Sequence, residues 1–315
     1  MKTRLLTSLC IVLTLALLFV LEVYVSVYFF DVFFMVIATI AAYEMSLLLT
    51  RMGRANNTIL ILTYPAFVAT ASVLGMYFGL NIGYVLLIDL AIGVLMFALS
   101  FLWGIIFKKS TLNEMRIRDI KDQKFVKFSF KKSFNTFLGM IYPSFLLLTM
   151  VLLNHFDEIG FGNIAAFDGK FSLFIILFTF LIPMFTDSFA MLCGMVIGGK
   201  KLVPKISPNK TISGAIGGTL FCVLISACVY LILGAIDYFN PVINNIAIWE
   251  FLIIVFIGSI IAQAGDIFES FLKRKAAVKD SGKILPGHGG MLDRIDSYIY
   301  VAPYLLLAFI CFILI

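Results

Sequence analysis

The chain has 315 residues, of which 62% are hydrophobic and only 13% are charged. Because a typical soluble domain is closer to half apolar and one quarter charged, this composition excludes an ordinary water-soluble protein. Apolar runs of about 20 residues recur along the whole length, which predicts an all-α polytopic membrane protein and not a β-barrel of short alternating segments. The net charge of +6 is concentrated in the connecting loops, so it does not indicate a nucleic-acid partner.

The apolar runs predict about nine spans. The first, at about 5–21, follows Lys2 and Arg4, and since no small-residue cleavage site follows it, we interpret it as a retained helix and not a signal peptide. The 171–199 run contains Pro183 and Asp187, and it is either one kinked helix or a helix followed by a re-entrant piece. The other spans are expected at about 32–49, 59–80, 82–107, 134–153, 214–236, 248–265 and 298–315.

The distribution of positive charge predicts the orientation. With a cytoplasmic amino terminus, every one of the 24 Lys and Arg residues except Lys170 falls on the cytoplasmic side. The longest polar loop, 108–132, combines nine of these residues with interleaved phenylalanines. It either lies against anionic lipid headgroups or is a solvated cytoplasmic loop, and the sequence leaves both alternatives open.

A densely charged segment, residues 266–296, separates the last two apolar runs. Such charge beside a bilayer is costly unless it lies in water or in a polar site. The carboxylates of Asp266, Asp293 and Asp296 suit a hard divalent cation, and the glycines around His288 let backbone N–H groups approach an anion. Basic side chains that suit phosphate oxygens are those of Lys273, Arg274, Lys279, Lys283 and Arg294.

Each of these features also has a structural explanation. Asp293 or Asp296 alone could cap the last helix, and the PGHGG sequence could be only a tight turn. Glu44 and Asp89 lie in apolar runs, and the sequence provides a partner for neither of them. The joint occurrence of carboxylates, basic residues and glycines is what favours a functional site.

The charged segment also carries an ordered set of motifs: SFLKR at 270–274, KDSG at 279–282, LPGHGG at 285–290 and LDRID at 292–296. A second block comprises DSFA at 187–190, KISP at 205–208, KT at 210–211 and Gly214, and AYE at 42–44 precedes both. Together they resemble phosphatidate cytidylyltransferases, also called CDP-diacylglycerol synthases. Ser213 departs from the family pattern, because members often carry Glu or Gln at this position.

The resemblance implies that CTP and phosphatidate react to CDP-diacylglycerol and pyrophosphate in the cell (inner) membrane, on its cytoplasmic face. It implies that Asp266 and Asp293 bind Mg²⁺, and we add Asp296 as a third candidate ligand. Whether a monovalent cation such as K⁺ binds as well is left open. The other implied catalytic residues are Lys279, Asp280, His288 and Arg294. The implied substrate-binding residues are Asp187, Lys205, Ser207, Lys210, Thr211, Ser270, Lys273, Arg274, Gly289 and Gly290.

We expect one membrane domain over residues 1–315, with amino-terminal spans and a basic loop in 1–133 and the catalytic site in 134–315. The expected partners are the two substrates and membrane lipids, and a homodimer is compatible with the sequence. Two alternatives stay open. One is another CTP-using membrane lipid enzyme, such as a polyprenol kinase-like protein, and the other is a transporter, although the chain shows no repeated halves.

Overall fold

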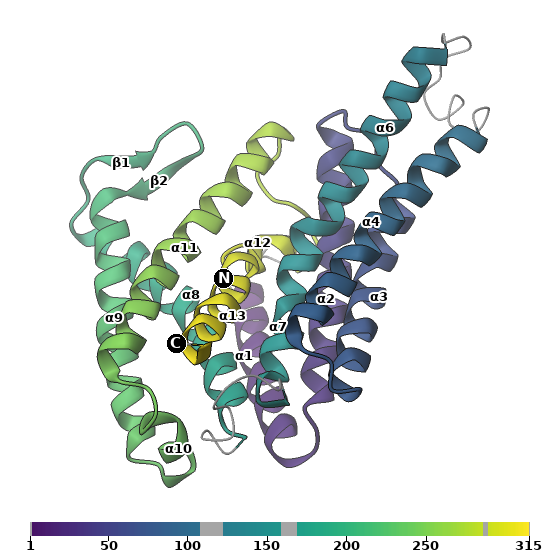
Figure 1. Ribbon diagram of the computed structural model, residues 1–315. Helices are drawn as coiled ribbons and strands as arrows, with labels where there is room; N and C mark the ends of the chain where they lie inside the picture. The colour runs from purple at the N-terminus through teal and green to yellow at the C-terminus, as the bar shows by residue number, and fades with distance from the viewer. Residues whose placement is uncertain (1, 108–121, 159–168, 286–288, 315) are drawn as a thin grey trace.

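The computed structural model describes residues 2–107, 122–158, 169–285 and 289–314 (Figure 1). This part of the chain is a bundle of helices with one short hairpin. In chain order the elements are α1 (Lys2–Tyr24), α2 (Tyr28–Arg51), α3 (Thr58–Tyr77), α4 (Ile82–Ile106), α6 (Asp122–Gly139), the π-helix η1 (Met140–Phe145), α7 (Leu146–Asn154), the 3₁₀ turn η2 (Phe156–Glu158), α8 (Phe171–Val196), β1 (Lys201–Val203), β2 (Ser207–Thr211), α9 (Ile212–Gly234), the 3₁₀ turn η4 (Asp237–Phe239), α10 (Asn240–Ile243), α11 (Ile248–Lys275), α12 (Leu292–Ile295) and α13 (Tyr298–Leu314).

Eight helical segments in the described chain are long and apolar enough to cross a membrane, and a shorter apolar stretch, Leu13–Tyr24, accompanies them. This confirms the predicted all-α polytopic membrane fold and agrees with about nine spans. The hairpin, the carboxyl end of α11 and the amino end of α6 all lie at the upper end in Figure 1. These three polar parts of the chain therefore lie at the same end of the bundle.

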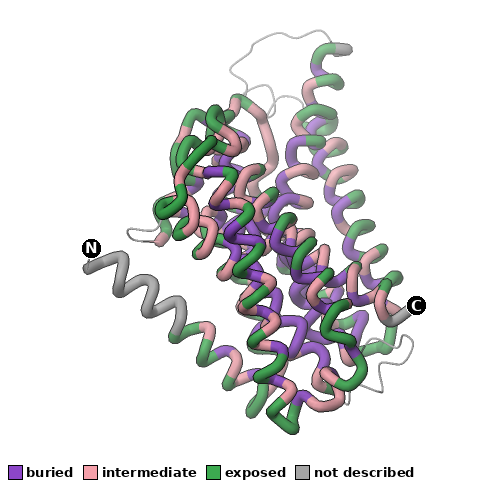
Figure 2. The backbone as a smooth tube through the Cα atoms, turned by 90° about the vertical axis from the view of Figure 1, so that its left-hand side faces the viewer, coloured by how far each residue is buried: buried purple, intermediate pink, exposed green. Residues whose placement is uncertain are grey.

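Buried residues concentrate in the interior of the bundle, while exposed residues line its outer helix faces (Figure 2). Helix α13 packs against α7, α8 and α11. Its Phe309 makes an edge-to-face contact with Phe171 of α8, with ring centroids 5.1 Å apart, and Phe174 and Phe178 of α8 contact Phe251 of α11 in turn. These interlocking rings fix how the helices that carry the charged segment are packed.

The expected start of the span at 134–153 was wrong, and the open choice for the 171–199 run is resolved. Residues 122–132, which we predicted to belong to a polar loop, are helical and continue into the next span. Phe125, Ser129 and Ser133 are buried there at intervals of four residues, so one face of the helix packs while its lysines stay outside. The 171–199 run forms one α-helix that accommodates Pro183, which settles the choice left open above.

The basic segment after α8 is a β-hairpin and not an irregular loop. Strands β1 and β2 pair antiparallel, with Lys201 opposite Thr211. The Thr211 side chain then caps α9 by accepting a hydrogen bond from the Gly214 N–H at 3.1 Å. Ser213 donates from its hydroxyl to the Gly198 carbonyl, so the residue that departs from the family pattern ties the first turn of α9 to the segment just after α8.

Helices α8 and α9 cross at very short range. A Cβ atom at Gly218 would lie 2.7 Å from the Thr186 carbonyl oxygen, and one at Gly214 would lie 2.6 Å from that of Ala190. Small residues at such a crossing let two backbones approach closely inside a membrane. The close crossing holds the two ends of these helices together where the hairpin joins them.

A buried network of ionisable side chains lies at the amino-terminal end of α2. The His155 ring contacts Asp31 through Nε2 at 2.8 Å and Glu158 through Nδ1 at 3.0 Å, and Asn154 also donates to Asp31. Burial alone would lower the pKa of His155, but hydrogen bonds to the two carboxylates outweigh it and raise this pKa to about 9. The charged ring therefore ties α2 to the turn that follows α7.

Candidate active site

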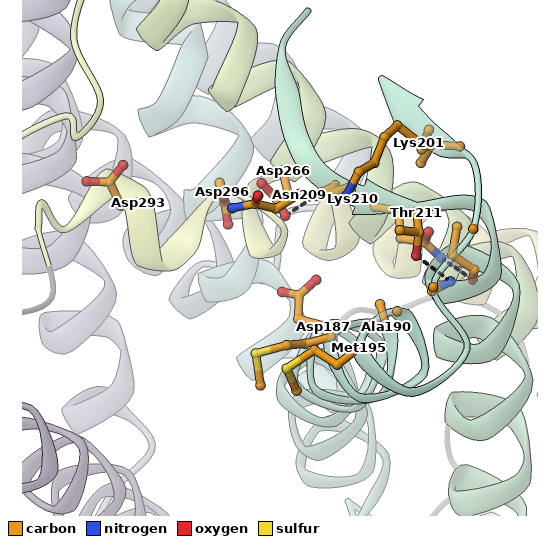
Figure 3. A pocket seen from close by; sticks show the side chains of 18 of the residues that line it. Asp187, Ala190, Met195, Lys201, Asn209, Lys210, Thr211, Asp266, Asp293 and Asp296 are labelled. Atoms are coloured by element: carbon orange, nitrogen blue, oxygen red, sulfur yellow. Dashed lines mark hydrogen bonds and ion pairs between the residues drawn. The ribbon is translucent and has the colours of Figure 1, made fainter. Parts of the chain in front are cut away.

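A cavity of about 800 Å³ opens at the hairpin end of the bundle, between α8, the hairpin, α9, α11 and α12 (Figure 3). This is the size range of small-molecule sites. Its polar lining consists of Asp187, Lys201, Asn209, Lys210, Thr211, Gln263, Asp266, Lys273, Asp280, Asp293, Arg294 and Asp296. The cavity thus brings together nine of the residues predicted from the sequence.

Three carboxylates gather at the centre of this cavity. Asp187 comes from the middle of α8, Asp266 from the last turns of α11, and Asp296 directly follows α12 (Figure 3). Asp296 is 8% exposed and accepts a hydrogen bond from the Ser297 N–H at 2.7 Å, while the Ser297 hydroxyl lies 3.5 Å from Asp187. Like charges so close together repel each other, and the hairpin places a lysine beside them.

That lysine is Lys210, whose ammonium forms an ion pair with Asp266. Lys210 and Thr211 are adjacent on β2, yet Thr211 caps α9 while Lys210 reaches across to α11. Ser270 supports the same carboxylate one helical turn further on, with its hydroxyl 3.4 Å from Asp266. Asp266 and Ser270 therefore lie on the same face of α11.

Asp293 has different surroundings from Asp266, although both line the same cavity. Its Oδ1 accepts a hydrogen bond from the Lys273 ammonium at 2.7 Å. Its Oδ2 accepts from the Gly290 N–H at 2.8 Å, the Ser281 N–H at 2.9 Å and the Ser281 hydroxyl at 3.0 Å. Asp293 is thus the carboxylate around which the segment between α11 and α12 is folded, and it is not a cap of the last helix.

Lys273 is enclosed by negative charge. In addition to Asp293 it pairs with Glu269, one turn earlier on α11, whose side chain is fully buried. Truncating one partner of such a buried pair leaves an uncompensated charge, so the three groups act as a unit. The Lys273 ammonium is therefore held by carboxylates, whereas we predicted that it binds substrate phosphate, and that role stays a prediction.

Several predicted site residues lie beside the cavity and do not line it. Arg274 donates to the Ile206 carbonyl at 3.1 Å and to the Val278 carbonyl at 3.3 Å, so it joins the hairpin to the loop after α11. Gly289, at φ +87°, holds a backbone conformation that a side chain would strain, and Gly290 donates to Asp293. Lys205 and Lys279 are exposed, Ser207 begins β2, and His288 is outside the described residues.

Sequence reasoning missed polar groups of the cavity and of its surroundings. Lys201 and Asn209 lie on the hairpin, and no strand was expected in this segment. Gln263, one turn before Asp266 on α11, donates to Thr219 at 2.9 Å and also lines the cavity. The contacts of Glu44 depend on tertiary packing, which single-sequence patterns do not contain.

Among the described residues, no group of three or more His, Cys, Asp or Glu side chains forms a preassembled metal cage. The candidate metal ligands at the centre of the cavity are nevertheless all carboxylate oxygens, the ligand type that Mg²⁺ prefers. This ion is usually held by one or two carboxylates together with substrate phosphates and water. The arrangement therefore fits a magnesium site that is completed by a phosphate-bearing substrate.

The fold is that of a polytopic helical membrane protein, and the cavity at one end of its bundle combines carboxylates with basic side chains. The cytidylyltransferase family model matches residues 2–312, almost the whole chain, so the chain belongs to the cytidylyltransferase family.

Relatives of known name agree with this assignment. A phosphatidate cytidylyltransferase of Staphylococcus saprophyticus is 38% identical over 197 residues, which cover 62% of this chain and 70% of the relative. Phosphatidate cytidylyltransferases of Staphylococcus haemolyticus and Staphylococcus aureus are each 49% identical over 133 residues, which cover 42% of this chain and 48% of each relative.

Proposed function

We propose that this chain transfers the cytidylyl group of CTP to phosphatidate, giving CDP-diacylglycerol and pyrophosphate. The observation that carries the proposal is the mixed lining of one cavity. Met191 and Met195, on the outward face of α8, are 61% and 66% exposed and line the same cavity as the carboxylates and lysines. A cavity that is lined by apolar side chains on one side and by charged side chains on the other fits a reaction between a lipid and a water-soluble nucleotide.

The chemistry requires no covalent intermediate. A phosphate oxygen of phosphatidate attacks the α-phosphorus of CTP, a new P–O bond forms, and the bond from the α-phosphorus to the bridging oxygen of the β-phosphate breaks. Pyrophosphate leaves with the electron pair of that bond. Such an in-line displacement depends on positioning and on charge neutralisation, because the nucleophile is already anionic. This accounts for a site made of carboxylates and basic residues without a Ser or Cys nucleophile.

The residues divide this work according to their charge. Asp266, together with Asp187 and Asp296 beside it, would hold Mg²⁺, which supplies neutralisation of the triphosphate charge when bound. Lys210 now pairs with Asp266, and it would contact phosphate oxygens once that carboxylate binds the cation. Lys201 and Arg294, which line the same cavity, would add positive charge around the leaving pyrophosphate. We propose that this site faces the cytoplasm, where CTP is found.

A labelling experiment tests the proposal against its alternatives. The purified protein, in vesicles that contain phosphatidate, is supplied with Mg²⁺ and with CTP labelled in either the α- or the γ-phosphate. We expect the α-label alone to appear in the lipid fraction and pyrophosphate to be released in equal amount. Transfer of the γ-label to a polyprenol or another lipid alcohol would identify a kinase, and transport without any lipid labelling would identify a transporter.

Lys210→Ala should raise the apparent KM for CTP about tenfold, with a smaller effect on the KM for phosphatidate, since one charge-assisted contact to the triphosphate is lost. Initial rates at varied CTP concentrations measure this. Lys200→Ala is the matched control, because Lys200 is exposed, precedes the same hairpin and does not line the cavity. An unchanged KM for CTP in Lys210→Ala would remove this residue from the nucleotide site.

A further inference from the structure

Glu44 of α2 is a buried carboxylate with a complete set of donors from a distant part of the chain. Its side chain is 1% exposed. Oε1 accepts a hydrogen bond from the Met291 N–H at 3.1 Å, and Oε2 accepts from the Leu292 N–H at 2.8 Å and the Ser281 hydroxyl at 2.9 Å. An ionisable residue inside a span is costly, so a carboxylate held there by three donors calls for a functional explanation.

Glu44 and Asp293 hold opposite sides of one loop. The Ser281 hydroxyl lies between them, 2.9 Å from Glu44 Oε2 and 3.0 Å from Asp293 Oδ2, so its single proton is shared by the two carboxylates. The Ser281 N–H turns toward Asp293, whereas the N–H groups of Met291 and Leu292 turn toward Glu44. Hydrogen bonds to the carboxylates of Glu44 and Asp293 therefore connect the two stretches 281–282 and 290–292. Of these two carboxylates, only Asp293 lines the cavity.

The glycines of this loop are fitted to Glu44. A Cβ atom at Gly282 would collide with the Glu44 side chain, to which its three nearest atoms all belong. A Cβ atom at Gly290 would collide with both Glu44 and the Ser281 hydroxyl. The loop backbone thus approaches the carboxylate as closely as a glycine allows, and the amino-terminal half of the chain determines the position of this loop.

We propose that Glu44 is a positioning residue, which acts through the loop and sets the place of Asp280, Asp293 and Arg294 in the cavity. All three line the cavity, and Glu44 itself does not. This inference rests on the proposed function, since what it positions is the cytidylyl-transfer site. It also explains why a carboxylate is needed where a buried apolar residue would fill the same space, because only an acceptor can gather three donors from two stretches of loop.

The first test combines kinetics with limited proteolysis of the full-length protein in vesicles. In Glu44→Gln we expect kcat to fall at least tenfold, with a change of less than threefold in the KM for CTP, because the substrate contacts remain while their alignment is lost. We also expect trypsin to cleave faster after Lys279 and Lys283, which are exposed and flank the fastened stretch. Glu250→Gln is the control: it alters a carboxylate at the start of α11 that does not line the cavity, keeps an acceptor for the Ala247 N–H, and should change neither readout.

The second test is a double-mutant cycle. Gly282→Ala alone should lower kcat strongly, because the added methyl group meets Glu44. In the Glu44→Ala background the same substitution should have little further effect, so the two changes should be markedly non-additive. Additive effects would show that the two residues act separately and would overturn the proposal.

The outcomes separate the failure of this inference from the failure of the proposed function. A wild-type protein that does not label lipid from CTP contradicts the proposed function, and the proteolysis pattern still reports whether Glu44 holds the loop. An active wild-type protein together with an unchanged kcat in Glu44→Gln contradicts the positioning role, whatever the rate of cleavage. A lower kcat with unchanged cleavage contradicts it as well, since the effect would then not pass through the loop.

Discussion

Asp266→Asn is expected to reduce the turnover of CTP at least ~100-fold, the loss seen when one group that stabilises developing charge is removed from an active site. The substitution preserves the size of the side chain and removes the negative charge that faces Lys210. Because the Asp266 side chain is 25% exposed and its partner is also accessible, the fold should tolerate the change. Steady-state rates at saturating CTP and phosphatidate measure the loss, and thermal unfolding in detergent checks the fold.

Glu250→Gln provides the comparison for this variant. Glu250 lies on the same helix, α11, at its opposite end, where its carboxylate accepts a hydrogen bond from the Ala247 N–H at 3.0 Å. A glutamine retains an acceptor there, so activity should stay within twofold of the wild type. If Asp266→Asn turned over CTP at a near-normal rate, the assignment of the central carboxylates to the metal would have to be abandoned.

Asp293→Asn should also abolish turnover, but through a different defect. Both oxygens of Asp293 accept hydrogen bonds, and an asparagine must turn its NH₂ group either toward Lys273 or toward the N–H groups of Ser281 and Gly290. Either choice sets donor against donor in a nearly buried position, which costs about 1–3 kcal/mol. We therefore expect loss of activity together with faster trypsin cleavage after Lys279 and Lys283, while the helices still insert.

Asp266→Asn should not show this second effect, so the pair of variants separates a carboxylate that serves chemistry from one that also holds the loop. Cleavage rates that are equal in both variants would contradict the distinction. Normal turnover in Asp293→Asn would remove Asp293 from the active site altogether.

The sequence predicted the helical membrane fold well because a span is a long, nearly uncharged run, and such runs are visible in composition alone. It failed where charge continues along a helix. We expected the span before the charged segment to end near residue 265, but α11 continues to Lys275. Glu269 pairs with Lys273 one turn later, so these charges are accommodated within the helix. A charged stretch at the end of a span therefore resembles a loop in sequence and is still helical.

The candidate site was predictable in part for a related reason. Asp266, Asp293 and Asp296 are close in sequence to one another and to the basic residues, so their clustering could be inferred, and all three line one cavity. Which lysine pairs with which carboxylate within the cavity could not be inferred. Lys210 reaches Asp266 and Lys273 reaches Asp293 because of how the hairpin and α11 pack, and neither pairing follows from spacing along the chain.

The bonds between Glu44 and the loop join residues that are 237 to 248 positions apart. During synthesis α2 is inserted long before Ser281 and Leu292 leave the ribosome. Until then the Glu44 carboxylate must be hydrogen-bonded to other groups or to water. Contacts of this separation form late in folding. A nascent chain that has already inserted most of its spans therefore still lacks the bonds that order this loop, and they can form only after Leu292 has been synthesised.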